Sequence, residues 1–377
     1  MKILFAPDSF KGSIRSPEVC RILQQAFQAE IPNAEYVCLP MADGGEGTVE
    51  AVLAAAKGER HQIKVDGPLG KQVLADFAFF PETRQAVLEM ASASGLELLC
   101  QEEQNPLVTS TYGTGQLLQE ARRLGAQEVI LGIGGSATVD GGAGMAQALG
   151  CHLFDHQGRE LPKGGAALQH LAGLDLHALE EWRQHINIRV ACDVTNPLTG
   201  PTGAVAVFAP QKGATAEMLP ILEAGLQNWG EHLVRHGLIQ DSCQPGDGAA
   251  GGLGLSLRAL LGARMESGAK LIAELVGLKQ QLAKADLLIT GEGCTDEQTC
   301  YGKLPAVVAE LAKEAGVPVI LLSGAIQGPQ NVLRQKFHAV FSCLSEVAPL
   351  DQVLRSAREN LSDRARAIAA TLRIAGF

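Results

Sequence analysis

The stretch KILFAPDSFKGSIRSPEVCRILQQAF, residues 2–27, contains in succession a short apolar run, a polar loop and an amphipathic pattern. The run at 2–7 is typical of a short buried strand, and Ser16 followed by Pro17 is a helix-start signal. One face of this helix then collects the apolar residues Val19, Ile22, Leu23, Ala26 and Phe27. The stretch therefore predicts one β-loop-α unit.

The same unit recurs at both ends of the chain. EYVCLP at 35–40 leads through MADGGEGT at 41–48 into a second amphipathic helix. Beyond residue 284, further apolar runs lie at 285–290, 317–323 and 338–343, with helical patterns from about 305 and near 351–373. Short apolar strands that alternate with helices are typical of a parallel α/β sheet. The two chain ends together predict a parallel domain of five strands.

The segment between the ends has a different pattern. Residues 61–91 alternate apolar with polar side chains, which favours antiparallel strands. The rest of this segment predicts helices near 114–124, 215–235 and 266–278, and strands near 128–132, 187–191 and 203–209. We therefore expect an α/β domain of residues 1–60 plus 284–377, interrupted by an inserted mixed α/β domain of residues 61–283. A cleft between the two is the expected place for an active site.

Composition narrows the class of protein. The 377 residues carry a formal net charge of −10, and 46% of them are hydrophobic. Neither nucleic acid nor an anionic membrane attracts an acidic protein, so we expect neither as a partner. The N-terminus has no secretory h-region and no stretch is apolar enough to span a membrane, which indicates a cytoplasmic protein. Nine cysteines without a C-x-x-C pair fit reduced thiols.

Three polar loops follow three of the predicted strands: PDSFKGS at 7–13, MADGGEGT at 41–48 and TGEGCTDEQTCYGK at 290–303. Ligands of open parallel sheets bind beyond the carboxyl ends of the strands, so we expect these loops to converge at one site. Lys11 and Ser13 offer donors to an anion, whereas Asp43 and Glu46 offer carboxylates. Each residue taken alone also fits an ordinary surface or capping role.

Glycines dominate the stretch LGIGGSATVDGGAGMAQALG at 131–150. Its first glycines resemble a dinucleotide fingerprint, but Ala137 stands where the third glycine belongs, and the stretch lies inside the inserted region. Backbone N–H groups and hydroxyls around Ser136 and Thr138 suit phosphates better. A phosphate site therefore ranks first. A nicotinamide-dependent hydroxy-acid dehydrogenase is an alternative, and a two-domain ligand-binding sensor is a third.

A phosphate site suggests phosphoryl transfer, although the common kinase signatures G-x-x-x-x-G-K-[ST], H-R-D and D-F-G are absent from the sequence. ACDVTNPLTGPTGA at 191–204 places Asp193 at the end of an apolar run, beside Asn196, Thr199 and Thr202. Such an aspartate accepts a proton from an attacking hydroxyl or holds Mg²⁺; its alternative role is to cap an Asx turn. Asp193 is therefore the candidate general base.

Seven motifs in order resemble the glycerate kinases of the bacterial glycerate 2-kinase type, and the resemblance covers essentially the whole chain. The motifs are FAPDSFKGS (5–13), MADGGEGT (41–48), GIGGSATVDGGAGMAQALG (132–150), ACDVTNPLTGPTGA (191–204), FAPQKGA (208–214), PGDGAAGGLG (245–254) and ITGEGCTDEQTCYGK (289–303). The resemblance implies a flavodoxin-like domain interrupted by a second α/β domain. It also implies phosphoryl transfer from Mg-ATP to D-glycerate, giving 2-phosphoglycerate in sugar-acid or glyoxylate catabolism. A kinase that gives 3-phosphoglycerate is the nearest alternative, and we expect a monomer or a homodimer.

The resemblance also implies roles for individual residues. Asp193, Lys11 and Asp43 are the catalytic candidates, with Asp193 as general base, and Asp43 and Asp193 are the candidate ligands of Mg²⁺. The candidates for binding glycerate are Ser9, Ser13, Glu46, Asp296, Gln298, Thr299 and Lys303. The candidates for binding the phosphates of ATP are Gly134, Gly135, Ser136, Thr138, Asp140 and Lys212.

One position departs from the family pattern. The G-E-G motif usually continues with an arginine, whereas this chain has Cys294. The residues that remain in pattern beyond it are Asp296, Gln298, Thr299 and Lys303. If the usual arginine contacts the substrate, Arg264 or Lys303 is expected to supply the positive charge instead.

Overall fold

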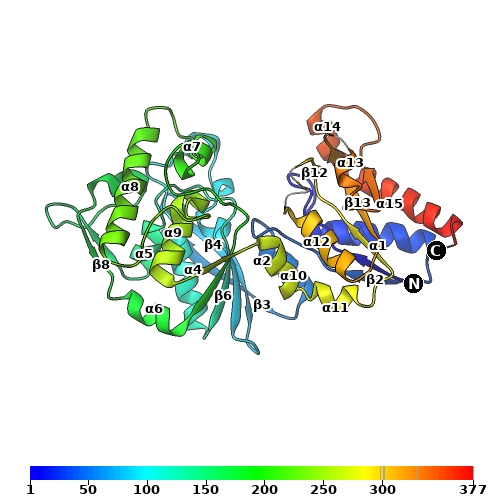
Figure 1. Cartoon of the computed structure of the whole chain (residues 1–377), viewed down its shortest axis with the longest axis horizontal. Coiled ribbons are helices and arrows are strands. Elements are labelled where there is room, and N and C mark those ends of the chain that lie inside the picture. Colours follow the sequence, from blue (N-terminus) through cyan, green and yellow to red (C-terminus); the bar gives the residue numbers. More distant parts are fainter. Residues whose placement is uncertain (298, 300–301, 329, 377) are drawn as a thin grey trace. The chain divides into compact units, whose positions relative to one another are not determined.

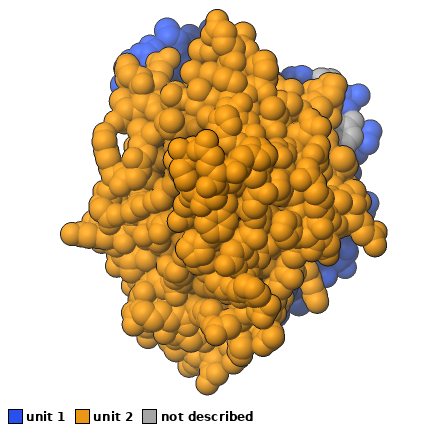
Figure 2. All heavy atoms as spheres, turned by 90° about the vertical axis from the view of Figure 1, so that its left-hand side faces the viewer, with its two compact units in different colours: residues 1–43, 50–57, 268–377 blue, residues 44–49, 58–267 orange. Residues whose placement is uncertain are grey.

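The computed structural model describes residues 1–297, 299, 302–328 and 330–376. It divides into two compact units, which Figure 2 colours separately. Unit 1 comprises residues 1–43, 50–57 and 268–377, and unit 2 comprises residues 44–49 and 58–267. Both chain ends therefore belong to unit 1, and its last segment starts at 268, upstream of the expected boundary at 284.

A five-stranded parallel sheet forms the centre of unit 1, in the order β15-β13-β11-β1-β2. Figure 1 labels β13 and β2 of this sheet. Its strands are β1 (Lys2–Phe5), β2 (Glu35–Cys38), β11 (Leu287–Thr290), β13 (Val319–Ser323) and β15 (Ala339–Ser342). Numbered within the unit, they follow the order 2-1-3-4-5, which is the flavodoxin-like order. The expected parallel domain of five strands is confirmed.

Helices connect these strands. They are α1 (Ser16–Glu30), α2 (Thr48–Ala55), α10 (Gly268–Leu275), α11 (Leu278–Leu282), α12 (Leu304–Glu314), α13 (Gln330–Leu333), α14 (Leu350–Arg355) and α15 (Ala357–Ile374). The short strands β12 (Cys294–Thr295) and β14 (Ala325–Ile326) pair with each other in a separate two-stranded sheet. Helix α1 begins at Ser16 as predicted, but Arg15 occupies the N-cap and no side chain caps the first turn.

Alternation along the strands decides which helices cover each face of this sheet. Ile3 and Phe5 of β1 pack in one cluster with the apolar faces of α1 and α15. Leu4 between them is also buried and points to the other face, because successive strand residues alternate. Helix α12 contacts β11 and β13. A sheet buried on both faces explains why these strands are continuous apolar runs rather than alternating ones.

Unit 2 contains a six-stranded mixed sheet in the order β10-β9-β6-β5-β4-β3. Its strands are β3 (Glu59–Asp66), β4 (Gln72–Phe80), β5 (Gln85–Glu89), β6 (Glu128–Gly132), β9 (Asn187–Ala191) and β10 (Arg264–Glu266). β3, β4 and β5 pair antiparallel, as the alternating pattern of residues 61–91 predicts, and β5, β6, β9 and β10 pair parallel. A small sheet of β7 (His152–Phe154) and β8 (Gly173–Asp175) completes the strands of this unit in the described residues.

The helices of unit 2 pack around its sheet with one continuous apolar core. They are α3 (Ala91–Ser94), α4 (Tyr112–Arg123), α5 (Ala143–Ala148), α6 (Leu179–His185), α7 (Ala204–Phe208), α8 (Leu219–Arg235) and α9 (Ala249–Leu261), with the 3₁₀ helices η1 (Leu96–Leu98), η2 (Gln101–Glu103), η3 (Gly165–His170) and η4 (Pro210–Lys212). Among the helices of the described residues, none has both the length and the apolar character that a membrane crossing requires.

One expected strand of unit 2 is wrong. Residues 203–209 form helix α7 instead of a strand. Ala204 and Val205 are buried whereas Val207 is exposed, so the run has a buried and an open side within one helical turn. A short apolar run of this length does not distinguish the two structures by periodicity. The turn at 199–203 and Pro210 then confine the segment to about one helical turn.

Candidate active site

The carboxyl ends of three neighbouring strands of unit 1, β1, β2 and β11, lead into the polar loops that the sequence singles out. Backbone hydrogen bonds tie these loops together. The Asp8 N–H donates to the Gly291 carbonyl over 2.8 Å, and the Met41 N–H donates to the Pro7 carbonyl over 2.9 Å. Within unit 1, the three loops therefore converge at one edge of the sheet, as predicted.

Lys11 and Asp43 form an ion pair at this edge, with 3.1 Å between the Lys11 Nζ and the Asp43 Oδ2. The lysine side chain is 76% exposed and the aspartate side chain 36%. The negative charge of Asp43 is the main cause that raises the pKa of Lys11 above its usual value. Lys11 is therefore a positively charged, accessible group at neutral pH.

Asp8 lies directly beyond β1 and is 7% exposed. Burial, and next the charge of Asp43, raise the pKa of Asp8 from 3.8 to about 7, while the N–H of Ser9 and the charge of Lys11 act against this. The Ser9 N–H donates to the Asp8 Oδ1 over 2.6 Å. Asp8 therefore exchanges a proton near neutral pH, as an acid–base group must. Sequence reasoning missed it, although its place directly after a buried apolar run is a signal for a site carboxylate.

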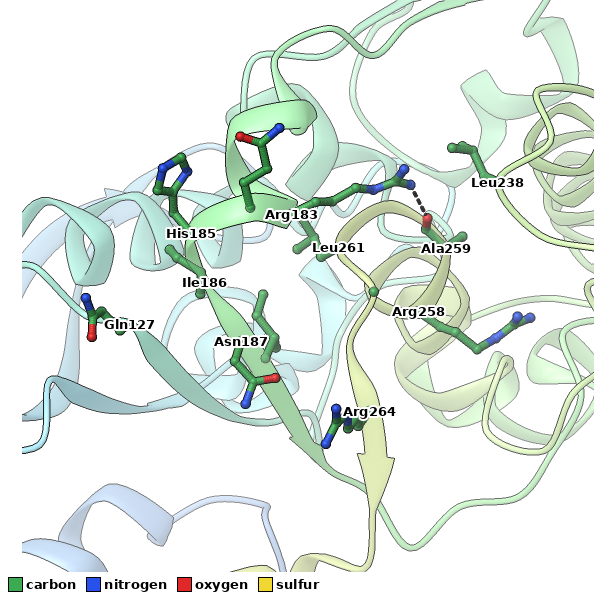
Figure 3. A pocket seen from close by; sticks show the side chains of 13 residues that line it. Gln127, Arg183, His185, Ile186, Asn187, Leu238, Arg258, Ala259, Leu261 and Arg264 are labelled. Carbon is green, nitrogen blue, oxygen red and sulfur yellow. Dashed lines mark hydrogen bonds between the residues drawn. The ribbon is translucent and has the colours of Figure 1, made fainter.

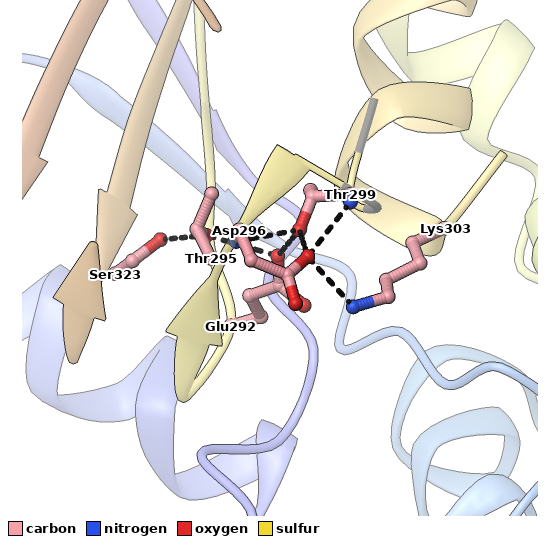
Figure 4. Close-up of polar contacts among 6 residues, drawn as sticks. All are labelled: Glu292, Thr295, Asp296, Thr299, Lys303 and Ser323. Atoms are coloured by element: carbon pink, nitrogen blue, oxygen red, sulfur yellow. Dashed lines mark hydrogen bonds and ion pairs between the residues drawn. The ribbon is translucent and has the colours of Figure 1, made fainter. Parts of the chain in front are cut away.

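A further carboxylate of unit 1, the half-buried Glu292, lies in the loop after β11 (Figure 4). Its Oε1 accepts hydrogen bonds from the hydroxyls of Thr295 and Thr299 over 2.9 and 2.7 Å. The hydroxyls of Thr295 and Ser323 lie 2.6 Å apart, which links the loop to the end of β13. Burial raises the pKa of Glu292, and the two threonine hydroxyls oppose this. Sequence reasoning did not select Glu292 as a site residue, because a glutamate between two glycines also fits an ordinary turn.

The same network contains three of the predicted glycerate-binding residues (Figure 4). The Lys303 Nζ lies 3.1 Å from the Asp296 Oδ1, which also accepts the Thr299 N–H over 3.1 Å. Gln298 lies outside the described residues. Cys294, which stands where the family pattern has arginine, is exposed on β12. Lys303 is therefore a cation close to the position of the missing arginine.

The other polar residues predicted in these loops have different surroundings. The Ser13 hydroxyl donates to the Phe10 carbonyl over 2.9 Å, within a tight turn. Ser9 contributes its backbone N–H to Asp8. Glu46 is exposed in the turn before α2 and belongs to unit 2, whereas Asp43 belongs to unit 1.

In unit 2, the turn that contains Glu46 is held from the end of β5. The Glu89 carboxylate accepts hydrogen bonds from the N–H groups of Gly47, over 3.2 Å, and of Val49. The Thr48 hydroxyl donates to the Gly45 carbonyl over 2.8 Å. A carboxylate at the N-terminus of a helix stabilises that end of the helix. Glu89 lies in no motif that the sequence reasoning singled out, and only the pairing in space identifies its role.

The glycine-rich loop follows β6 and packs closely on the same turn. The Gly134 N–H donates to the Gly44 carbonyl over 3.5 Å, and a Cβ on Gly134 would lie 2.9 Å from the Gly45 Cα. Gly135 has a φ of 73°, in the left-handed region that favours glycine. These glycines therefore allow one backbone of the protein to approach another and the chain to reverse.

Lys212, at the end of η4, is a buried lysine of unit 2 and is 3% exposed. Its Nζ donates to the Ser136 Oγ over 2.6 Å and to the Thr138 carbonyl over 2.8 Å. Burial lowers the pKa of Lys212 from 10.5 to about 7, while the charge of Asp140 acts in the opposite direction. The structure thus brings together four of the predicted phosphate-binding residues.

Asp140 is fully buried and organises the loop. Its Oδ2 accepts the N–H and the hydroxyl of Thr111 over 2.8 and 3.0 Å and the Gly144 N–H over 3.3 Å. Its Oδ1 accepts the Gly142 N–H over 3.1 Å. Burial raises the pKa of Asp140, and these hydrogen bonds oppose the effect. The N–H groups at the start of α5 are therefore engaged by a carboxylate of the protein itself.

The motif at 245–254 supports the same loop. Ala250, Gly251 and Gly252 have φ values of 52°, 68° and 92°, which makes a left-handed turn at the start of α9. The Gly141 N–H donates to the Gly251 carbonyl over 3.0 Å. Two glycines in three positions keep this conformation accessible. The motif therefore holds the phosphate-loop candidate in shape.

Asp193 and Arg264 lie toward different ends of the strands of unit 2. Asp193 is exposed just beyond the carboxyl end of β9, where the sequence predicts it. Arg264 is the first residue of β10 and lines an open pocket of about 620 Å³ with Gln127 and Asn187, at the starts of β6 and β9 (Figure 3). The structure therefore does not bring Arg264 together with Asp193 or with the glycine-rich loop.

No group of three or more His, Cys, Asp or Glu side chains is arranged to hold a metal ion in the part of the chain that the structure describes. Mg²⁺ at nucleotide sites usually takes one or two carboxylates and completes its shell with phosphate oxygens and water. Asp43, with its partly exposed carboxylate, fits such a site. The donor set thus suits Mg²⁺ that arrives with a nucleotide.

Comparison with known proteins shows a consistent likeness. The model of the glycerate kinase family matches residues 3–373. A glycerate 2-kinase of Escherichia coli K12 is 44% identical over 99% of this chain and 98% of its own length, and a glycerate kinase of Bacillus subtilis 168 is 45% identical over 100% and 98%. A crystal structure of a Salmonella typhimurium LT2 protein described as a glycerate kinase 2 matches with a TM-score of 0.88 and 44% identity, over 100% of this chain and 99% of that one.

Proposed function

The chain belongs to the glycerate kinase family, and we propose that it is a cytoplasmic glycerate 2-kinase. It transfers the γ-phosphoryl group of ATP to the C2 hydroxyl of D-glycerate, giving 2-phosphoglycerate in sugar-acid or glyoxylate catabolism. The observation that carries this proposal is the match to a relative named glycerate 2-kinase over nearly the full length of both chains. The free thiols of the described cysteines support a reducing compartment.

The phosphates of ATP are proposed to bind at the glycine-rich loop of unit 2. The contacts of Lys212 with Ser136 and Thr138 support this, because they place a basic group beside a loop of N–H groups and hydroxyls. Gly134 and Gly135 allow the backbone to approach a ligand closely. Asp140 is proposed to position the loop through its four hydrogen bonds rather than to touch the nucleotide.

Glycerate is proposed to bind at the polar loops of unit 1. Lys11 is exposed and positively charged, and Lys303 extends from the network of Asp296 and Thr299. A small hydroxy acid needs a cation for its carboxylate and donors or acceptors for its hydroxyls. Ser9, Ser13, Glu46 and Gln298 remain candidates for the hydroxyl contacts, and Arg264 is the weakest candidate because it lies at the starts of the strands.

The proton of the attacking hydroxyl needs an acceptor near neutral pKa. Asp193 is the proposed general base, and its place beyond the carboxyl end of β9 supports that role. Asp8 is a second candidate, favoured by its burial and by its pKa of about 7. The two assignments differ in the unit that supplies the acceptor, so substitution separates them.

Mg²⁺ is proposed to enter with ATP as part of the substrate, and Asp43 and Asp193 are the carboxylates proposed to complete its coordination. When bound, the ion neutralises part of the phosphate charge. The chain's own groups then hold the acid, orient its hydroxyl and accept its proton. A nicotinamide-dependent dehydrogenase and a ligand-binding sensor are not favoured, because the family match is to kinases.

Phosphorus NMR of the purified full chain with ATP, Mg²⁺ and D-glycerate tests the proposal, with L-glycerate as the control. We expect ADP and a phosphomonoester on the C2 oxygen with D-glycerate alone. An ester on C3 would keep the kinase and correct its position of attack. Intact ATP with either glycerate would refute the proposed activity.

A further inference from the structure

The amine of Lys212 has acceptors for two N–H groups. These are the Ser136 Oγ and the Thr138 carbonyl, and its surroundings in the described residues provide no third hydrogen bond to the Nζ. A neutral amine is satisfied by two acceptors, whereas an ammonium has three N–H groups and needs one more. Thr138 also has a buried hydroxyl oxygen without a hydrogen-bond partner in the described part of the chain. The cluster therefore provides acceptors for both N–H groups of a neutral amine and leaves one N–H of an ammonium without an acceptor.

The charges around Lys212 lead to the same conclusion. Asp140 is the titratable group that acts on it from the glycine-rich loop. The oxygens of Asp140 already accept four hydrogen bonds. Thr111 at the start of α4 and Thr109 before it present uncharged hydroxyls to this loop. An ammonium at Lys212 therefore needs an anion from outside the protein as its close partner.

We propose that Lys212 takes up one proton from solvent when an anionic phosphate oxygen of ATP binds beside Ser136. This inference rests on the proposed function and adds a proton to its binding step. The proton adds to the lone pair of the Nζ, and no bond of the nucleotide breaks. The phosphate oxygen accepts the third N–H, and its charge stabilises the ammonium.

This proton uptake makes the affinity for ATP fall as the pH rises. The pKa of Lys212 is about 7 in the chain without ligand, and a phosphate beside it raises this pKa. Between the two pKa values, one proton enters with each nucleotide, so the affinity for ATP falls about tenfold for each pH unit. Below about pH 6 the lysine is already protonated, and this contribution to the pH dependence vanishes.

Calorimetric titration of the full chain with ATP and Mg²⁺, without glycerate, tests the inference. The titration is run at about pH 8, where phosphate groups with a second pKa of about 6 are ionised and contribute no proton. Buffers of different ionisation enthalpy are compared, because the slope of the observed heat against that enthalpy counts the protons taken up. We expect close to one proton, and ATP binding without proton uptake would overturn the inference.

Two variants provide a matched comparison. Lys212→Met removes the titrating amine and should bind ATP with no proton uptake at about pH 8. Lys71→Met removes an exposed lysine of the same unit, paired with Glu103, and should keep the uptake of the unmodified chain. Equal uptake in Lys212→Met and the unmodified chain would show that another group titrates. The buffer series on the unmodified chain decides the question even if Lys212→Met does not fold.

Two further titrations identify the anion. Adenosine, which has no phosphate, should bind without proton uptake. If D-glycerate alone caused the uptake, the partner would be a carboxylate and the inference as stated would be wrong. The NMR assay is independent of these results: a chain that phosphorylates glycerate without proton uptake keeps the proposed function and loses this inference, and a chain that does not turn over ATP loses the function.

Discussion

Asp8 in unit 1 and Lys212 in unit 2 are an acid and a base whose usual pKa values are 3.8 and 10.5, yet both have a pKa of about 7 in the folded chain. The neighbouring charges act differently on these two pKa values. Around Asp8, the charge of Asp43 adds to the effect of burial. Around Lys212, burial acts against the charge of Asp140. Loss of water is therefore the main cause at both residues, and the neighbouring charge reinforces it at Asp8 but opposes it at Lys212.

This difference separates two functions of charge in the molecule. Unit 1 gathers the carboxyl groups of Asp8, Asp43 and Glu292 at the edge of its sheet, and the charges of Asp43 and Glu292 both make ionisation of Asp8 harder. Unit 2 surrounds a single amine with hydroxyls, carbonyls and glycine backbone. The carboxyl groups of unit 1 suit proton transfer. The surroundings of Lys212 suit a bound anion, whose negative charge stabilises the ammonium.

The largest expected effect concerns the proton acceptor. Asp193→Asn should lower kcat by about 10²–10⁴-fold, the usual contribution of a general base, with little change in the Kd for ATP. Asp8→Asn is the matched variant in the other unit. Steady-state kinetics with D-glycerate and nucleotide binding measure both. Full turnover in Asp193→Asn together with a loss in Asp8→Asn would transfer the role to unit 1.

Stability against pH should show opposite slopes for the two buried groups. Between about pH 4 and 7 the folded chain holds a proton on Asp8 that the unfolded chain lacks, so this group's contribution to the free energy of unfolding falls by about 1.4 kcal/mol per pH unit as pH rises. Between about pH 7 and 10 the unfolded chain holds the extra proton on Lys212, so that contribution rises by about the same amount.

Urea unfolding of Asp8→Asn and Lys212→Met, each compared with the unmodified chain across pH, measures these slopes. Asp8→Asn should remove the fall on the acid side and leave the alkaline side unchanged. Lys212→Met should do the reverse. A variant that shifts stability equally at every pH would show that its side chain matters for packing and not for proton binding.

A smaller effect tests the influence of neighbours directly. Asp43→Asn removes the charge that is the second cause of the raised pKa of Asp8, so this pKa should fall by about one pH unit toward its usual value. Carboxyl-carbon NMR of labelled aspartate follows the titration of Asp8. Asp140→Asn is the contrasting variant, because loss of that charge should lower the pKa of Lys212 further. If the titration of Asp8 did not change, burial and not the charge of Asp43 would be the cause of its raised pKa.

The smallest effect concerns the departure from the family pattern. Cys294→Arg restores the usual residue on the exposed strand β12, near the carboxylates of Asp296 and Glu292. An exposed ion pair contributes about 0.2–1 kcal/mol, so the KM for D-glycerate should fall by about 1.4- to fivefold with kcat nearly unchanged. Cys294→Ser is the control for loss of the thiol. A KM that does not move would show that Lys303 already supplies the charge.

Local patterns predicted most of the fold. Short apolar runs followed by helical faces predicted the five strands of unit 1, and strict alternation predicted the antiparallel pairs of β3, β4 and β5. The prediction failed at 203–209, where a short apolar run fits a helix as well as a strand. Periodicity needs several repeats before it separates the two structures, and five residues are too few.

The candidate site was less predictable. The motifs contained Lys11, Asp43 and Lys212, but Glu89 lies in a strand without a motif, and its contacts with the turn before α2 arise only when β5 ends beside that turn. Arg264 was selected for its charge alone. The register of β10 pairs it with Arg189 in the middle of β9, and its side chain lines a pocket with Asn187 at the start of that strand. The sequence shows which residues are charged, whereas strand pairing decides at which end of the sheet each of them lies.

By itself, the sequence determined the alternation of strands and helices, the polar loops at strand ends and the family of the chain, because each depends on residues that are near neighbours or on motifs in order. Tertiary structure alone decided which groups are buried and which residues they contact. Lys212 donates a hydrogen bond to Ser136, and the charge of Asp43 raises the pKa of Asp8, although the residues of each pair are far apart in the sequence. The pKa values follow from the loss of water and from these partners, which no local pattern specifies.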